Sequence, residues 1–213
     1  MRIAICIKGV HYMNGEHNWY IDYEKQLNNF YEMIINPLKI DDNIIDIFLS
    51  TYQSNKLDNL KDSYKTNEIY IQEFNIDECR FDAQYKHHMT LYNNVKKHSL
   101  KNNIKYDLII TTRFDLEMNH HITKIQLKYD TFNISFKQPS GDADDCLWIF
   151  PGTDIDIVIS ALEHMRSESK QLHKIESYYT KKINFLVSVD YYSKYPIFNL
   201  KRTVRDNVYE RCK

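Results

Sequence analysis

Glycine, proline and cysteine are scarce in this chain of 213 residues, with four of each. The Walker A loop and the GxGxxG turn both need clustered glycines to hold phosphate groups, and no such cluster exists here. P-loop kinases and Rossmann dehydrogenases are therefore not expected. The four cysteines are widely separated and form no CxxC pair, which indicates free thiols in a reducing, cytoplasmic compartment.

Long apolar runs and an excess of charge of one sign are also missing. No segment approaches the roughly 18 apolar residues of a membrane span, and the N-terminus lacks a signal peptide. The net charge of −1 argues against a nucleic-acid partner held by a broad basic face. With 43% hydrophobic residues, the chain has an ordinary globular composition. We expect one monomeric domain over residues 1–213, either on its own or cut from a longer chain.

Short apolar runs alternate with segments of helical periodicity along the chain. Strands are expected at 2–7, 44–52, 68–74, 107–112, 130–136, 146–150 and 196–200, and helices at 20–34, 55–65, 80–100, 153–165 and 174–187. This order is typical of an α/β fold with an open, mostly parallel sheet covered on both faces. Ligands of such sheets bind beyond the carboxyl ends of the strands, so the residues that follow each strand are the first candidates for function.

The strongest local motif follows the strand 107–112, where the chain continues into Asp115-Leu116-Glu117. In an extended segment, residues two apart point to the same side, so both carboxylates would face one site. Two like charges about 4 Å apart repel by roughly 4 kcal/mol at an effective dielectric near 20, which a divalent cation would relieve. Oxygen ligands suit Mn²⁺ or Mg²⁺, with diphosphate oxygens in the remaining positions; the alternative is a solvated acidic loop.

Further candidates follow the other strands or lie at the start of a helix. Gly9 permits a close backbone approach to a ligand. Cationic and polar side chains could contact the phosphates, base or ribose of a nucleotide, or could simply face solvent or pair with a carboxylate. These candidates are Lys8 after the first strand, Thr51 and Tyr52 after the second, Arg80 and Gln84 on the helix at 80–100, and Arg113 before Asp115.

An acidic loop, Gly141-Asp142-Ala143-Asp144-Asp145, precedes the apolar run 146–150. One of its carboxylates, Asp144 or Asp145, could take the proton from an acceptor hydroxyl as a general base. The alternative is again a solvated acidic loop.

The opening strand Arg2-Ile3-Ala4-Ile5-Cys6-Ile7, the segment Tyr106–Leu116 and the run Asp144–Ile149 together resemble GT-A-type nucleotide-sugar glycosyltransferases, in particular a glycosyltransferase domain of chlorella-virus capsid-glycan synthesis. The resemblance implies a mixed sheet of about six strands flanked by helices. It also implies a UDP-sugar donor, a glycan acceptor and Mn²⁺ or Mg²⁺. Its DxD-type metal motif would map onto Asp115 and Glu117, although many relatives carry aspartate at the second position, and its acceptor-side carboxylate onto Asp144 or Asp145.

These observations lead to the hypothesis of a metal-dependent, inverting glycosyltransferase. Lys8, Arg80 and Arg113 would contact the donor, and Asp144 or Asp145 would deprotonate the acceptor. Two rivals stand beside it. A non-catalytic nucleotide- or carbohydrate-binding module would bind the donor without hydrolysing it, and a metal-dependent phosphohydrolase would need an acidic nucleophile after the first strand, where Ile7-Lys8-Gly9 offers none.

Overall fold

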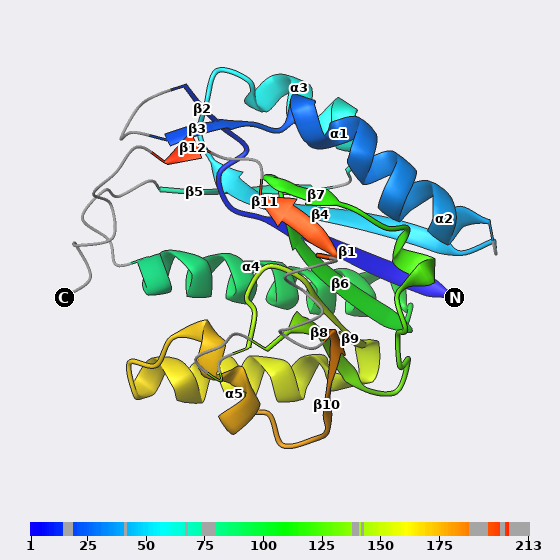
Figure 1. The fold of residues 1–213 in the computed structure, drawn as a ribbon, viewed down its shortest axis with the longest axis vertical. Coiled ribbons are helices and arrows are strands. Elements are labelled where there is room, and N and C mark those ends of the chain that lie inside the picture. Colours follow the sequence, from blue (N-terminus) through cyan, green and yellow to red (C-terminus); the bar gives the residue numbers. More distant parts are fainter. Residues whose placement is uncertain are drawn as a thin grey trace.

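A central sheet of seven strands divides the molecule into layers, as a computed structural model of the chain shows (Figure 1). The structure describes residues 1–14, 19–40, 42–66, 68–73, 80–137, 141, 143–187, 196–200 and 203–204. The strand order is β10-β8-β9-β6-β1-β4-β5. The strands of this sheet are β1 (Arg2–Lys8), β4 (Ile44–Tyr52), β5 (Glu68–Gln72), β6 (Leu108–Arg113), β8 (Phe132–Phe136), β9 (Trp148–Pro151) and β10 (Ile183–Val187).

Most neighbours in this sheet are parallel. β6, β1, β4 and β5 run in one direction, and β10 runs parallel to β8. β9 is antiparallel to both β6 and β8. The expected open, mostly parallel sheet is therefore confirmed, with one reversed strand inside it.

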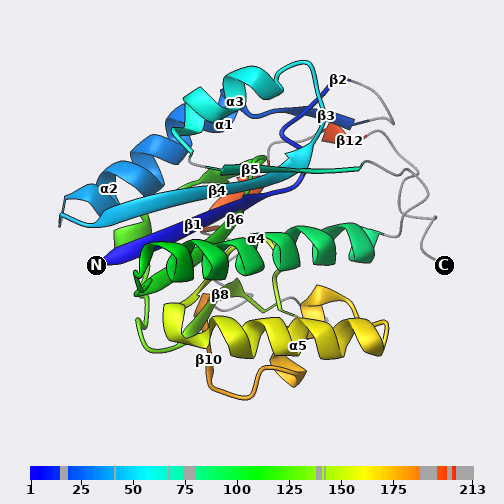
Figure 2. The ribbon, with the colours of Figure 1, turned by 180° about the vertical axis from the view of Figure 1, so that it is seen from behind.

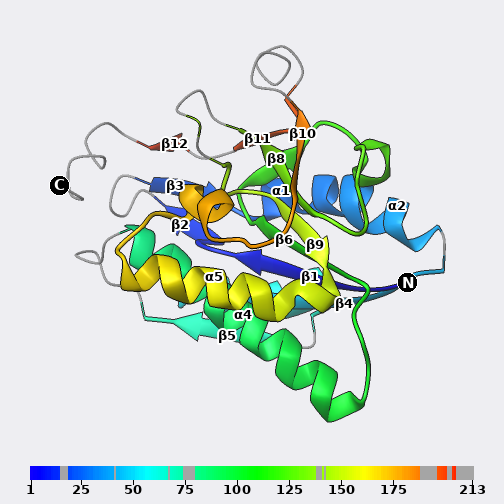
Figure 3. The same cartoon turned by 90° about the horizontal axis from the view of Figure 1, so that it is seen from below.

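Helices cover both faces of the sheet, which Figures 1 and 2 show from opposite sides. One face carries α1 (Glu24–Phe30), a π-helical segment η2 (Tyr31–Ile35), α2 (Asn36–Lys39) and α3 (Leu57–Tyr64). The other carries the long helix α4 (Arg80–Asn102) and α5 (Ile155–Ser167), which lie side by side in Figure 3. Pro37 explains the π-helical segment, because proline removes one backbone donor and its ring collides with the carbonyl four residues earlier.

The strands alternate between two apolar cores. Ile3, Ile5 and Ile7 of β1 pack in the core on the α1–α3 side, whereas Ala4 and Cys6 pack in the core on the α4–α5 side. Successive strand residues point to opposite faces, so this alternation also fixes where the polar residues at the strand ends point.

Short elements complete the fold. They are the strands β2 (Tyr12–Asn14), β3 (Trp19–Asp22) and β12 (Thr203–Val204) of a small sheet, the pair β7 (Leu116–Met118) and β11 (Phe198–Leu200), and the 3₁₀ turns η3 (Ile122–Lys124), η4 (Gly152–Asp154) and η5 (Leu172–Ser177). Tyr20, expected at the start of a helix, lies in β3. The expected helix at 174–187 is wrong, because that segment forms η5 and the edge strand β10. No helix among the described residues has the length and apolar character needed to cross a membrane.

Candidate functional site

The candidate site lies at the carboxyl edge of the central strands. β1, β4 and β6 are parallel, so Lys8, Ser50 and Arg113 end up side by side, with Lys8 the Cα partner of both others. Because β9 runs the opposite way, its beginning, and the residues Asp144–Cys146 that precede it, lie at the same edge. The reversed strand thus brings the acidic loop to the strand ends that carry the cations.

Lys8 is a buried cation, with 3% of its surface exposed. It continues the alternation of Ala4 and Cys6 and therefore faces the α4 layer. Burial lowers the pKa of its ammonium to about 8. The negative charge of Asp145 raises this pKa in part, and the positive charge of Arg113 lowers it further. The buried polar atoms that lack a hydrogen-bond partner in the described structure do not include this ammonium nitrogen. A cation at this place would attract an anionic ligand, because charges interact more strongly near a protein interior than in water.

Arg113 and Asp115 form a buried bidentate ion pair. The guanidinium Nε and an Nη donate to the two carboxylate oxygens of Asp115, each at 2.8 Å. Burial alone would lower the pKa of Arg113, but the carboxylate of Asp115 outweighs it and raises that pKa well above its ordinary value. Two of the roughly four lone-pair sites of the carboxylate are taken in this way, so a cation bound to Asp115 would share it with Arg113.

Asp115 lies in a turn, whereas Glu117 lies in the strand that follows it. Residues 114–115 form this turn between β6 and β7, so the extended segment expected from the sequence is interrupted and its alternation does not place the two carboxylates on one side. Glu117 is half-buried in β7, where its Cα partner is Asn199 of β11.

Asp144 is built into the loop before β9. Its Oδ2 accepts hydrogen bonds from the Ser135 hydroxyl and from the backbone N–H groups of Cys146 and Leu147, the latter two at 3.1 and 3.3 Å. Its backbone carbonyl accepts one from the Trp148 indole at 2.7 Å. Burial, and secondarily the charge of Asp145, raise the pKa of Asp144. These contacts stabilise the local turn as well as the carboxylate.

Asp145 is linked to the opposite element, α4. Gln84 Nε2 donates to its Oδ2 at 2.7 Å, and the Cys146 thiol contacts its Oδ1 at 3.5 Å. One ligand atom each from Asp144, Asp145 and Cys146 lie within 4.8 Å of one another. Burial raises the pKa of the Cys146 thiol well above its ordinary value. Cys146 was not among the expected site residues, although its position directly after two aspartates could have indicated it.

Thr51 lies on the opposite face of the sheet from Lys8. Its hydroxyl donates to the Gly9 carbonyl at 2.8 Å and contacts His11 Nδ1 at 2.7 Å, while Ser54 Oγ contacts His11 Nε2 at 2.7 Å. Gly9 adopts a φ of +102°, which favours glycine at the turn after β1. This network connects the turn after β1 to the end of β4. The Thr51 hydroxyl therefore stabilises the fold through its contacts with Gly9 and His11.

The α4 face above Lys8 carries His87. Its Nδ1 lies 2.8 Å from Ser50 Oγ, and its ring packs edge-on against Tyr52 at 4.9 Å. Burial and the charges of Lys8 and Arg113 lower the pKa of His87 to about 3, so its ring is neutral. The Tyr52 ring therefore contributes to the site by packing against His87. Arg80 begins α4, and its side chain lies outside the described atoms.

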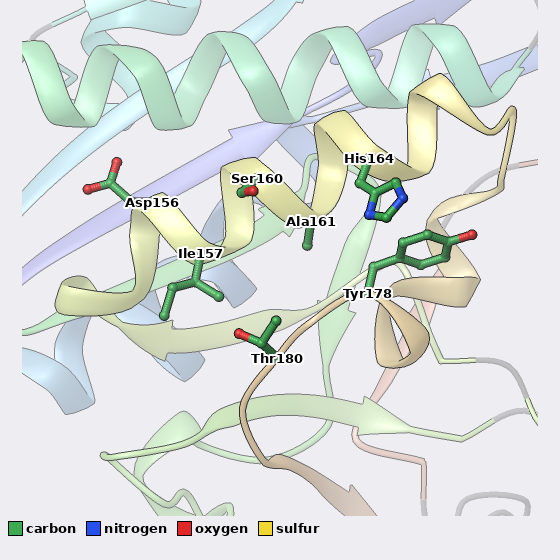
Figure 4. A pocket seen from close by; sticks show the side chains of 7 residues that line it. All are labelled: Asp156, Ile157, Ser160, Ala161, His164, Tyr178 and Thr180. Atoms are coloured by element: carbon green, nitrogen blue, oxygen red, sulfur yellow. The ribbon is translucent and has the colours of Figure 1, made fainter.

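A separate shallow groove of about 340 Å³ lies along α5 (Figure 4). It is lined by Asp156, Ile157, Ser160, Ala161, His164, Tyr178 and Thr180. These residues belong to α5 and the segment before β10, so the groove shares no residue with the cluster at the carboxyl edge.

Comparisons with known proteins match no family, but they match 165 chains of solved structures, one of which covers nearly the whole chain. No family model matches the chain, and no curated protein matches it. The structure is described as "crystal structure of a glycosyltransferase involved in the glycosylation of the major capsid of PBCV-1". It is 11% identical, with a TM-score of 0.47, over 98% of this chain and 96% of that one. At this level of likeness we build nothing on it.

Proposed function

We propose that this protein is a glycosyltransferase that moves a sugar from a nucleotide-sugar to a glycan hydroxyl. The donor that we propose is a UDP-sugar. The observation that carries the proposal is the convergence of Lys8, Arg113 and Asp145 at the carboxyl edge of the sheet, where Lys8 is the Cα partner of Arg113 and the charge of Asp145 acts on the Lys8 ammonium. A cation and a candidate base at the carboxyl edge of one sheet provide what transfer from a diphosphate needs. The motifs that resemble GT-A-type enzymes surround these same residues.

Lys8 and Arg113 are the groups we assign to the diphosphate. The Lys8 ammonium supplies three donors, and a buried site strengthens its attraction for an anion. Arg113 is already paired with Asp115, so its contribution is a fixed positive charge that also holds Asp115 in place. Together they would stabilise the negative charge that develops on the leaving diphosphate.

Asp115 and Glu117 are the carboxylates we assign to a divalent cation, Mn²⁺ or Mg²⁺. The assignment rests on the chemistry of the two side chains, because carboxylate oxygens are the ligands that Mn²⁺ and Mg²⁺ prefer, and on the partial exposure of Glu117. When bound, the cation would supply Lewis-acid neutralisation of the diphosphate.

Asp145 is our candidate for the general base. Asp144 is held by three donors in its own loop, whereas Asp145 is held from α4 through Gln84 and lies near Lys8. Its carboxylate would take the proton of the acceptor hydroxyl as that oxygen bonds to the anomeric carbon. The bond from that carbon to the diphosphate breaks, and the diphosphate leaves with the electron pair. A single displacement of this kind inverts the anomeric centre.

A nucleotide-binding module without catalysis is the second candidate, because buried cations alone are enough to bind a diphosphate. A phosphohydrolase is disfavoured, because the position after β1 is held by Lys8 and offers no acidic nucleophile.

Calorimetry of the full chain with UDP, GDP and uridine, with and without Mn²⁺, tests the proposal. We expect a nucleoside diphosphate to bind, Mn²⁺ to tighten binding, and Asp115→Asn to remove the effect of Mn²⁺ while Asp156→Asn on α5 keeps it. Slow release of free sugar from a bound donor would favour the enzyme over the module. Absence of binding by every nucleoside diphosphate would contradict both.

A further inference from the structure

His87 carries a buried ring nitrogen without a partner. The residue is 2% exposed, and its Nε2 forms no hydrogen bond within the described structure. The other ring nitrogen, Nδ1, is occupied by Ser50 Oγ. An unpaired polar atom buried beside Lys8 needs a physical reason, because burial without a hydrogen bond costs free energy.

The hydrogen-bond chain behind His87 allows the tautomer with a proton on Nε2. Gln72 Nε2 donates to Ser50 Oγ at 3.4 Å and to Thr90 Oγ1 at 2.8 Å. Ser50 Oγ keeps a second lone pair and its own hydrogen, so its 2.8 Å contact with His87 Nδ1 fits either direction. When Ser50 donates, the neutral imidazole carries its proton on Nε2 and presents an N–H donor, and this is the tautomer that the proposal below assigns.

The surroundings of this donor are positive. The charges of both Lys8 and Arg113 act on the ring of His87, and Lys8 is the Cα partner of Ser50, to which the ring is bonded. The edge-on packing of the Tyr52 ring against His87 holds the imidazole in place. An N–H donor in such a field is suited to an anionic oxygen.

We propose that His87 donates a hydrogen bond from Nε2 to an anionic phosphate oxygen of the nucleotide, next to the ammonium of Lys8. This proposal rests on the proposed function, since it uses the same nucleotide. The proposal adds a neutral hydrogen-bond donor, His87 Nε2, to the cations Lys8 and Arg113. Ser50 and Gln72 hold the imidazole from its other side.

Two substitutions of His87 distinguish the loss of the Nε2 donor from a general effect on folding. In His87→Gln the amide nitrogen can occupy the position of Nε2, whereas His87→Asn reaches only to the position of Nδ1 and keeps a partner for Ser50. We expect His87→Asn to weaken UDP binding by about tenfold or more, His87→Gln to retain most of it, and both to bind uridine as the wild type does. His98→Asn is the control. It removes an imidazole of the same helix whose Nδ1 lies 2.8 Å from the Tyr106 hydroxyl, outside the cluster around Lys8, and it should leave UDP affinity unchanged.

A second measurement does not depend on affinity. Long-range ¹H–¹⁵N spectra of the free protein should show the Nε2–H tautomer of His87, and titration with UDP should shift this proton downfield. The Nδ1–H tautomer, or equal UDP affinities for wild type and His87→Asn, would overturn the proposal. If the wild type binds UDP in that case, the proposed function stands without it. If the wild type binds no nucleoside diphosphate, the proposed function itself fails.

Discussion

At the scale of single residues, the surroundings of Lys8 change its chemistry. A lysine in water has a pKa near 10.4, but burial lowers that of Lys8 to about 8, so its charge varies over an accessible pH range. Arg113, one strand away, keeps its charge because Asp115 is paired with it. The two cations of the site therefore respond differently to pH.

UDP affinity is expected to fall as the pH rises above about 8, where Lys8 loses its proton. Only the charged ammonium attracts the diphosphate, so the association constant should decline by up to about tenfold per pH unit above that value. Calorimetry between pH 7 and 9.5 measures it. Lys8→Arg, which stays charged, should show no such decline, and Lys8→Met should bind weakly at every pH. The same decline in Lys8→Arg would show that another group is responsible.

The two neighbouring aspartates should separate by function. Asp145→Asn keeps an acceptor for Gln84, so we expect normal folding and UDP binding with transfer reduced by about 10²–10⁴-fold. Sugar-transfer kinetics and calorimetry on the same sample check both parts. Full transfer in Asp145→Asn would remove it as the base.

Asp144→Ala is expected to lower the free energy of unfolding by roughly 1–3 kcal/mol, because the buried N–H groups of Cys146 and Leu147 lose their acceptor. Urea unfolding measures this, and Ser135→Ala should reproduce only part of the loss. A variant as stable as the wild type would show that water replaces the carboxylate.

At the scale of elements, the connection between β9 and α5 depends on close packing against β6. Gly152 begins η4, where its backbone N–H donates to the Asp107 carbonyl at 3.0 Å. A Cβ added here would lie 1.9 Å from the backbone oxygen of Tyr106. Such contact requires the backbone of η4 to move away from the strand next to it.

Gly152→Ala is therefore expected to lower the free energy of unfolding by about 2 kcal/mol or more. Thr153→Ala, one residue along the same turn, should cost little. Equilibrium urea unfolding compares the two variants. Equal free energies of unfolding for Gly152→Ala and Thr153→Ala would show that the backbone of η4 shifts at little cost to accommodate the Cβ.

The long elements were predictable from sequence, and so were the short strands β9 and β11, whereas β2, β3 and β7 were not. The β-branched runs of β1, β4 and β6 and the periodicity of α4 predicted those elements to within a few residues. Strands of two to four residues such as β3 and β7 carry no usable periodicity. In β10, Ile183, Phe185 and Val187 alternate, but preceding apolar residues at helical spacing masked this alternation.

The site was predictable only in part, for a related reason. The parallel strands place Lys8 and Arg113 at one edge of the sheet, whereas the acidic loop lies there only because β9 is reversed, which the sequence did not predict. The face on which Thr51 lies depends on its register with β1, and the pairing of Arg113 with Asp115 depends on the turn at 114–115. Neither can be read from a single sequence. The metal assignment to Asp115 and Glu117 stays a prediction.

At the scale of the whole molecule, three buried histidines couple stability to pH. Burial lowers the pKa of His11 to about 4 and that of His87 to about 3, and lowers that of His88 well below its ordinary value. These rings stay neutral in the folded chain but take up a proton near pH 6.5 in the unfolded chain. Below that pH, the unfolded state binds more protons and is favoured.

Stability should therefore be complete above about pH 6.5 and fall as the pH drops toward about 4, with a slope of up to about 1.4 kcal/mol per pH unit for each histidine. Urea unfolding at pH 7, 6 and 5 measures this slope. His11→Asn should reduce it, whereas replacement of the exposed His164 should not. A slope unaffected by His11→Asn would assign the acid sensitivity to other groups.

The reversed direction of β9 has a consequence for how such a protein can diversify. The loops after β1 and β6 leave the sheet, while the segment between β8 and β9 enters it, anchored by the pairing of Trp148 with Thr111 and of Lys137 with Ala143. If the proposed function is correct, replacing that entering segment should change which acceptor is used and leave nucleotide binding at Lys8 and Arg113 intact. Specificity for the two substrates would then evolve on separate pieces of backbone.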